Sequence, residues 1–221
     1  MDAATAGTVR LEDYRPPRFL IPEVELDIDL VAEDEARVRA QLAVKRNPAA
    51  TDPAAALKLD LDELSVESVA VDGAALTPQR YTLDERQLVL SDVPEAFTLT
   101  TVSRIDPARN TKLMGVYTSS TGFFSLCEAE GFRRITPFLD RPDVMARYTV
   151  TLHADKSRYP VLLANGNLVA HFLGQSPPAA GEIQADRASD RRHRRRPAHP
   201  PGQRSSPQGA LRYPRQHSRP R

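Results

Sequence analysis

The 221-residue sequence contains no tryptophan and a single cysteine, Cys127. One cysteine cannot form an intrachain disulfide, and this pattern indicates a reducing compartment. The sequence has no run of 18 apolar residues, and residues 1–12 lack the apolar stretch of a signal peptide. We therefore expect a cytoplasmic protein that has no membrane as a partner.

The sequence also lacks the signatures of several catalytic classes. It has no Gly-rich phosphate-binding loop and no Gly-x-Ser-x-Gly nucleophile elbow. A helical zinc site needs two imidazoles one helical turn apart with a Glu beside the first, the HExxH motif. None of the histidines is followed by Glu or by a second His four positions later: His153, His171, His193, His199 and His217. We expect this chain to contain no catalytic residue and no metal ligand, and to bind no cofactor itself.

Charge is divided unevenly along the chain. Residues 171–221 carry 11 arginines, no lysine and 3 acidic residues, whereas residues 1–170 carry 19 basic and 26 acidic residues. A segment dominated by Arg, Pro, Ala, Ser, Gln and His cannot bury enough apolar surface to offset its ordering entropy. We expect residues 171–221 to form a disordered tail and residues 1–13 to form a flexible N-terminus.

Two hypotheses account for this tail. A shift of the reading frame near residue 170 would produce it, because out-of-frame GC-rich coding DNA yields these residue types. The alternative is a nucleic-acid-binding segment that neutralises phosphates with arginine. Phe172 and Tyr213 are its only aromatic residues, too few for a base-stacking platform. We therefore do not expect nucleic acid to be a specific partner.

Between the two ends, the sequence predicts short strands. Residues 36–45 alternate apolar with mostly polar side chains, the period of a strand with one buried face. Turn signals recur at intervals: Glu33-Asp34-Glu35, Asp72-Gly73, Asp84-Glu85 and Asn165-Gly166-Asn167. This spacing predicts an all-β fold over residues 14–170, an antiparallel sandwich or saddle-shaped double sheet. One short helix is expected over residues 140–147, capped by Asp140 with Pro142 in its first turn.

The most specific stretch runs from Cys127 to Val144 and reads CEAEGFRRITPFLDRPDV. It resembles the N-terminal domain of aminopeptidase N, the soluble bacterial type of the M1 family of zinc aminopeptidases. The resemblance covers residues 14–170, from the Tyr14-Arg15-x-Pro17 opening onward. It implies a β-rich domain that packs on a thermolysin-like catalytic domain, which holds one Zn²⁺ through HExxH and a downstream Glu. That catalytic domain is missing here, so we expect no peptidase activity from this chain alone.

The resemblance also implies roles for the Cys127–Glu130 loop. Members of the family release N-terminal residues from peptides, and the first Glu after the Cys, here Glu128, helps to anchor the substrate's α-ammonium. Cys127, Glu130 and Arg133 would support the loop. A carboxylate at that place favours a chain terminus through a charge-assisted hydrogen bond, whereas an internal peptide bond would leave it buried and unpaired.

Other interpretations of these residues stay open. Glu128 and Glu130 could be solvated loop carboxylates, and Cys127 a small buried hydrophobic residue. The family often has Gln before the Cys, but this chain has Leu126, so that polar contact is not carried over. The alternative function for residues 14–170 is a stand-alone β-sandwich binding module without catalytic chemistry.

Overall fold

The computed structural model describes residues 11–50, 56–120, 122–173 and 180–187. All of them lie in the first of two units of the chain, residues 1–189, and the second unit lies outside the described residues. The described chain forms these strands: β1 (Phe19–Ala32), β2 (Glu35–Arg46), β3 (Leu57–Asp60), β4 (Ser65–Val71), β5 (Ala74–Ala75), β6 (Thr82–Leu83), β7 (Gln87–Leu90), β8 (Ala96–Ile105), β9 (Gly115–Ser119), β10 (Gly122–Leu126), β11 (Arg147–Asp155), β12 (Asn167–Leu173) and β13 (Ala180–Arg187). It also forms three short 3₁₀ helices: η1 (Leu11–Asp13), η2 (Pro78–Arg80) and η3 (Phe132–Arg134).

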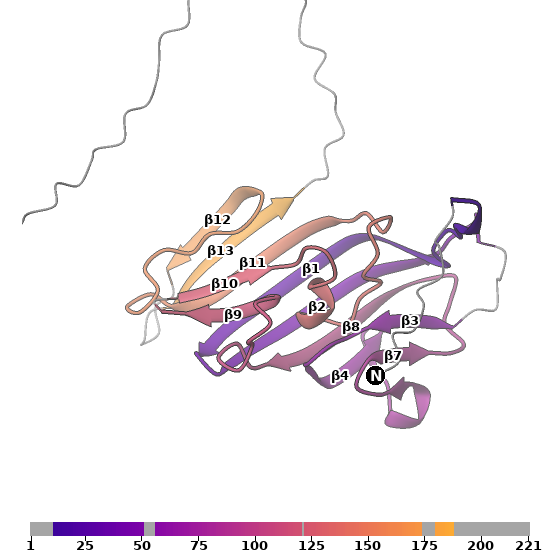
Figure 1. Ribbon diagram of the computed structural model, residues 1–221, viewed down its shortest axis with the longest axis horizontal. Helices are drawn as coiled ribbons and strands as arrows, with labels where there is room; N and C mark the ends of the chain where they lie inside the picture. Colours follow the sequence, from indigo (N-terminus) through magenta and orange to yellow (C-terminus); the bar gives the residue numbers. More distant parts are fainter. Residues whose placement is uncertain (1–10, 51–55, 121, 174–179, 188–221) are drawn as a thin grey trace, which may run out of the picture. The chain divides into compact units, whose positions relative to one another are not determined.

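Eight of the strands form one large sheet in the order β12-β13-β11-β1-β2-β8-β4-β5 (Figure 1). The pairs within it are antiparallel, except that β1 lies parallel to β11, with Glu23 opposite Arg147 and Leu30 opposite Ala154. A parallel pair needs a long crossover, and here everything from β2 to β10 lies between the two strands. The all-β prediction is confirmed, with this one parallel pair as an exception to the antiparallel expectation.

Period-two alternation determines which face of the sheet is buried. In β2 the side chains of Ala36, Val38, Ala40 and Leu42 are fully buried, whereas the intervening Arg37 and Arg39 are exposed. β1 follows the same rule, with four carboxylates on its exposed face: Glu23, Glu25, Asp27 and Asp29. One face of the sheet is therefore exposed to solvent, and the other, apolar face requires a covering layer.

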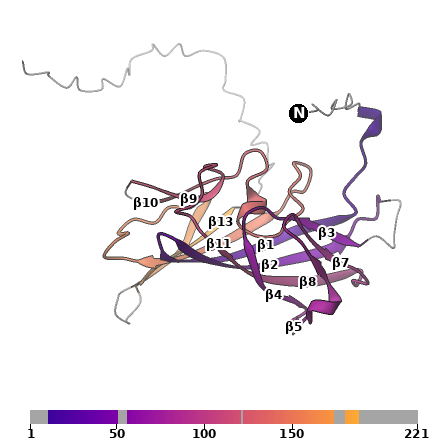
Figure 2. The same ribbon diagram turned by 60° about the horizontal axis from the view of Figure 1, so that its bottom comes forward.

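The covering layer consists of a three-stranded sheet in the order β3-β7-β6 and the β9–β10 hairpin (Figure 2). Leu57, Leu59, Leu88 and Leu90 from β3 and β7 are at most 1% exposed and belong to the same apolar core as β1, β2 and β8. η3 and the chain after it complete this core with Ile135, Phe138 and Val144, among others. The predicted sandwich of two sheet layers is thus present.

Most of the predicted turns join strands as expected. The Glu33-Asp34 turn joins β1 to β2, and Asp72-Gly73 joins β4 to β5 with φ angles of 49° and 79°. The carboxylate of Asp84 accepts two backbone N–H bonds in the turn between β6 and β7. The hairpin expected around Asn165-Gly166-Asn167 is wrong, because residues 161–163 form no strand and β12 pairs instead with β13.

The helix expected over residues 140–147 is also wrong, since this stretch forms a turn and then enters β11. The carboxylate of Asp140 accepts bonds from the backbone N and the Nε of Arg133, so it does not cap a helix. A single turn remains, in which the N–H of Val144 donates to the carbonyl of Arg141 at 3.1 Å.

The expected domain boundary after residue 170 falls inside β12, which extends to Leu173, and residues 180–187 form β13. The remainder of the predicted tail, like residues 1–10 of the predicted N-terminal segment, lies outside the described residues. Among the residues that are described, no helix has the length and apolar character needed to cross a membrane.

Candidate functional site

The Cys127–Glu130 loop connects β10 to η3 as a tight turn. The N–H of Gly131 closes it by donating to the carbonyl of Cys127 at 2.9 Å, and the Glu128–Ala129 peptide bond is cis. A Cβ at Gly131 would lie 2.7 Å from the carbonyl oxygen of Leu126 and 2.8 Å from the Cα of Cys127. Only glycine permits this approach of the backbone to itself, so the sequence forces the shape of the loop locally.

Gly115, at the start of β9, lies directly beneath the loop. Its φ is +74°, a left-handed conformation, and a Cβ there would lie 2.7 Å from the Cβ of Arg134. Its N lies 3.2 Å from the position of a Cβ on Gly131. Two glycines from different elements therefore let β9, the loop and η3 pack against each other at close range.

Glu128 is exposed at this loop. Within the described part of the chain, no hydrogen-bond donor or cation pairs with its carboxylate. An exposed carboxylate without a protein partner keeps its full capacity to accept bonds from an incoming cation. The two glutamates of the loop differ in this respect.

Glu130 has a partner, because its carboxylate lies 3.4 Å from the guanidinium of Arg133 while its side chain stays 68% exposed. Arg133 is tied more firmly to Asp140: its backbone N and Nε donate to the carboxylate at 3.1 and 3.0 Å, and its Nη2 donates to the carbonyl at 3.1 Å. Arg133 thus fastens the C-terminal side of the loop to the turn that follows η3.

Cys127 is partly buried and packs against the apolar core. Burial, with a smaller effect of the negative charge of Asp140, raises the pKa of the Cys127 thiol to about 11. The thiol therefore stays protonated at neutral pH, which does not suit a nucleophile. In the loop, Cys127 therefore serves as a small apolar side chain that packs against the core.

The sequence interpretation missed Arg134, which organises the opposite side of η3. Its guanidinium contacts the carboxylate of Asp62, lies 2.5 Å from that of Glu63, and donates through Nε to the carbonyl of Met114 at 3.0 Å. Lys112 also reaches Glu63, at 2.7 Å. Nothing in the pair Arg133-Arg134 marks the second as the buried one, because only its partners 71 and 72 residues away decide this.

Two large apolar side chains are exposed on β10 before the loop. Phe124 is 48% exposed and Leu126 is 47% exposed, and Phe124 stacks on Tyr117 of β9 with ring centroids 5.9 Å apart. Leu126, which stands where the family often has Gln, therefore presents an apolar surface next to the carboxylate loop.

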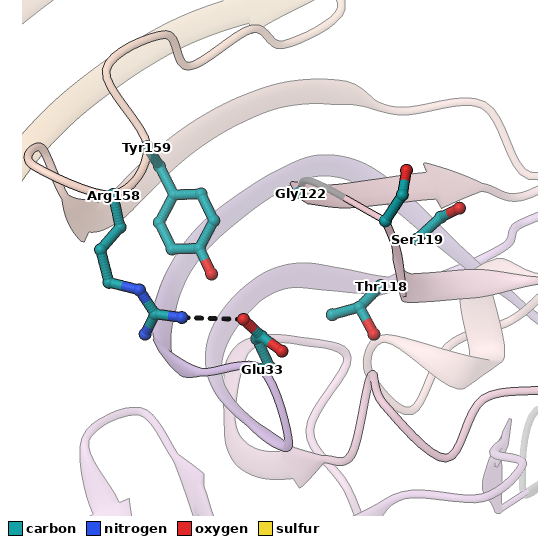
Figure 3. A pocket seen from close by; sticks show the side chains of 7 residues that line it. Glu33, Thr118, Ser119, Gly122, Arg158 and Tyr159 are labelled. Carbon is teal, nitrogen blue, oxygen red and sulfur yellow. Dashed lines mark hydrogen bonds and ion pairs between the residues drawn. The ribbon is translucent and has the colours of Figure 1, made fainter.

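A separate hollow of about 370 Å³ lies at the tips of the β1–β2 and β9–β10 hairpins (Figure 3). Its lining is polar: Glu33, Thr118, Ser119, Ser120, Gly122, Arg158 and Tyr159. Arg158 and Glu33 point toward each other across it and form an ion pair at 2.8 Å, so these two charges neutralise each other. None of the four residues of the Cys127–Glu130 loop lines it.

The zinc ion that the resemblance implies for a catalytic domain does not fit the residues present. Within the described ranges, no three His, Cys, Asp or Glu side chains gather where they could hold a metal ion. The full sequence also lacks the HExxH pair. No catalytic step through a metal can be assigned to these residues.

Comparison with known proteins gives a consistent result. Residues 23–172 match the family described as the Peptidase M1 N-terminal domain. The chain is 44% identical over 186 residues to aminopeptidase N of Caulobacter vibrioides, covering 80% of this chain and 21% of the relative. It is 43% identical over 158 residues to aminopeptidase N of Escherichia coli, covering 72% of this chain and 18% of the relative.

Solved structures agree. Aminopeptidase A of Legionella pneumophila, in complex with aspartic acid, superposes with a TM-score of 0.73 at 28% identity, over 80% of this chain and 21% of that one. An M1 zinc metallopeptidase from Deinococcus radiodurans has a TM-score of 0.62 at 17% identity, over 78% of this chain and 39% of that one, a likeness of fold alone. The chain spans about a fifth of the length of the curated relatives it matches.

Proposed function

The chain belongs to the M1 peptidase family through its N-terminal domain, and on this premise we propose that its Cys127–Glu130 loop binds the free amino terminus of a peptide. Glu128 accepts hydrogen bonds from the α-ammonium group in this proposal. Cys127, Glu130 and Arg133 hold the loop in place. The peptide bond itself is cleaved by a zinc-containing catalytic domain, the partner of this domain, which the 221 residues do not encode.

One observation carries the proposal: Glu128 is exposed and has no partner among the described residues, although the loop around it is held on both sides. Gly131 closes the loop on itself, and Arg133 fastens it to Asp140. A loop that served only solubility would not need this fixed backbone. A held carboxylate with open acceptor sites is suited to a cation that approaches from outside, and an α-ammonium provides three donors.

The surroundings of Glu128 support a peptide as the bearer of that ammonium. Phe124 and Leu126, two positions apart on β10, place exposed apolar area before the loop. Apolar side chains exposed in a group favour coverage by a partner. We propose that the catalytic domain covers part of this area, with the substrate's amino terminus between the two domains.

Binding by the chain itself can be tested with two small ligands. We expect L-leucinamide to shift the backbone NMR signals of residues 127–131, with a dissociation constant of about 10 mM or weaker for so few exposed contacts. N-acetyl-L-leucinamide, which has no ammonium, should leave these signals unchanged. The Glu128→Gln variant should lose the response, and Glu85→Gln, the same change at an exposed position of the β6–β7 turn, should retain it. Equal shifts with both ligands would refute the proposal.

A chimera tests the same role in catalysis. Residues 14–173 of this chain would replace the matching segment of the Caulobacter vibrioides aminopeptidase N. In that background, Glu128→Gln should lower kcat/KM for an alanine anilide by about tenfold to a hundredfold, the value of one charge-assisted contact. Glu85→Gln, at an exposed position outside the loop, should change it by less than about threefold. An active chimera that is indifferent to Glu128 would contradict the anchor role.

A further inference from the structure

Two stretches far apart in the sequence meet beside the site. We call residues Tyr14–Pro17 the strap. The Tyr14 hydroxyl donates to a carboxylate oxygen of Asp143 at 3.0 Å, across 129 positions of sequence. Arg141 Nη2 donates to the backbone carbonyl of Arg15 at 2.9 Å. The strap is therefore bound both by its side chain and by its backbone.

Both ends of this contact are themselves fixed. Arg141 donates to both carboxylate oxygens of Asp143, at 2.9 and 2.7 Å, a two-point ion pair that sets the direction of the guanidinium. The hydrogen bond from Arg141 is the main reason that the pKa of Asp143 is lowered. At the other end of the strap, Asn47 donates to the carbonyl of the buried Pro17 at 2.7 Å. The strap is thus held between β2 and the turn of Arg141.

The same turn carries the partner of the candidate loop. Asp140 precedes Arg141, and its carboxylate accepts both the N–H and the Nε–H of Arg133. Arg133 in turn reaches Glu130 at 3.4 Å. The described structure therefore contains an unbroken series of contacts from Tyr14 through the turn to the Cys127–Glu130 loop.

We propose that the strap positions the Cys127–Glu130 loop, with Tyr14 and Arg141 as positioning residues. Release of the strap removes the Tyr14 bond to Asp143 and the Arg141 bond to the Arg15 carbonyl. The turn that carries Asp140 is then held less firmly, and so is Arg133, which connects this turn to the loop. The consequence for amine binding depends on the proposed function, because only Glu128 would contact the ligand. The position of the loop itself does not depend on it.

Cys127 provides a direct reporter, since it is the only cysteine in the sequence and lies in the loop, partly buried. Its rate of reaction with an aromatic disulfide reagent at fixed pH measures how often the loop opens. Tyr14→Phe removes only the hydroxyl, and we expect the rate to rise about threefold to tenfold. Arg141→Gln removes the bond to the carbonyl of Arg15 and also the ion pair that orients Asp143, the acceptor of the Tyr14 hydroxyl, so it should raise the rate at least as much.

Arg147→Gln is the matched control, because Arg147 also forms an ion pair at 2.7 Å, with Glu23, but does so on β11 away from the strap. It should leave the rate unchanged. The variant with both Tyr14→Phe and Arg141→Gln should react no faster than Arg141→Gln alone, since both changes break one connection. If the two changes raised the labelling rate additively, the inference that Tyr14 and Arg141 act through one connection would be wrong.

Global opening is distinguished by amide hydrogen exchange in β2. If exchange in β2 accelerates as much as the labelling of Cys127, the strap stabilises the whole domain and the inference is wrong. Unchanged labelling in Tyr14→Phe and Arg141→Gln would also overturn it. No peptide is present in these measurements, so a failed amine titration and a failed labelling result are separate outcomes.

Discussion

Two turns that carry carboxylates lie against η3, and they differ in what their carboxylates contact. Asp62 and Glu63 both bind Arg134 and Lys112. Glu128, two residues before Glu130, has no partner among the residues described. Both turns carry carboxylates, so residue type does not explain the difference. Asp62 and Glu63 have cationic side chains within reach and stabilise the fold, whereas Glu128 has none in the part of the chain that the structure describes and can accept bonds from a ligand.

The two adjacent arginines of η3 account for this difference. Arg134 has a side chain that is only 4% exposed and is surrounded by its acidic partners, so its charge is neutralised inside the protein. Arg133 is occupied by Asp140 and reaches only Glu130 in the loop. Neither arginine is left to neutralise Glu128.

Removal of the buried Arg134 should have the largest effect on this difference between the two turns, because Asp62 and Glu63 then lose their main partner. Arg134→Met should destabilise the domain by about 2 to 4 kcal/mol, because two carboxylates lose their main cation and the carbonyl of Met114 loses one of its two donors. Urea unfolding measures this directly. Arg104→Met, at an exposed position of β8, should change stability by less than about 0.5 kcal/mol. A comparably small loss for Arg134→Met would show that Asp62 and Glu63 do not need the pairing.

The second test changes the backbone packing of the Cys127–Glu130 loop. Gly131 has an ordinary φ of −89°, so alanine there is opposed by the contacts of its Cβ with Leu126, Cys127 and Gly115 and not by backbone strain. Overpacking of this kind costs about 1 to 3 kcal/mol. Gly122→Ala is the control, since a Cβ there meets nothing within 4 Å. Gly131→Ala should therefore have a lower melting temperature than Gly122→Ala. Equal melting temperatures would mean that the loop accommodates the extra methyl group without loss of stability.

The sequence predicted the strands of this fold well, because alternation is a local property. Residues 36–45 form β2 with the expected face buried, and the turns at Asp72-Gly73 and Asp84-Glu85 join strands as their chemistry requires. The helix over residues 140–147 failed for a non-local reason. The carboxylate of Asp140, its expected cap, is bound to Arg133 seven residues earlier.

The candidate site was predicted only in part. A recognisable stretch located Glu128 and its loop, but their geometry depends on contacts that no local pattern encodes. The burial of Arg134 depends on Asp62 and Glu63, 72 and 71 residues away, and the strap depends on a contact between Tyr14 and Asp143. The parallel pairing of β1 with β11 has the same origin. Such contacts follow from the tertiary fold and not from residue type.

Acid should weaken the turn of Asp62 and Glu63, whose carboxylates bind Arg134 and Lys112. Hydrogen bonding from Arg134, followed by that from Lys112, lowers the pKa of Glu63 from 4.5 to about 2. The unfolded chain therefore binds this proton first as the pH falls. The stabilisation is complete above about pH 4.5 and is lost progressively toward pH 2. Because the side chain is half exposed, we expect it to amount to no more than about 1 kcal/mol.

Glu63→Gln should flatten this part of the pH profile of the unfolding free energy, measured by urea titration between pH 6 and 2.5 at constant ionic strength. Lys112 is itself exposed, so higher salt should reduce the dependence but not remove it. A profile identical to that of the unmodified chain would assign the acid sensitivity to other groups.

The smallest effect on stability is expected where the functional proposal is strongest. Glu128→Gln removes a charge that none of the described residues pairs with, so the folded state loses no contact. The unfolding free energy should stay within about 0.5 kcal/mol of the unmodified value. The same exchange at Glu63 should destabilise by up to about 1 kcal/mol, since an ion pair is lost there. Urea unfolding of both variants at pH 7 makes this comparison with the same chemistry at two sites. If Glu128 contributes nothing to folding and is still needed for the response to leucinamide, its carboxylate is held in place for a ligand. A large loss of stability in Glu128→Gln would instead make Glu128 a structural residue.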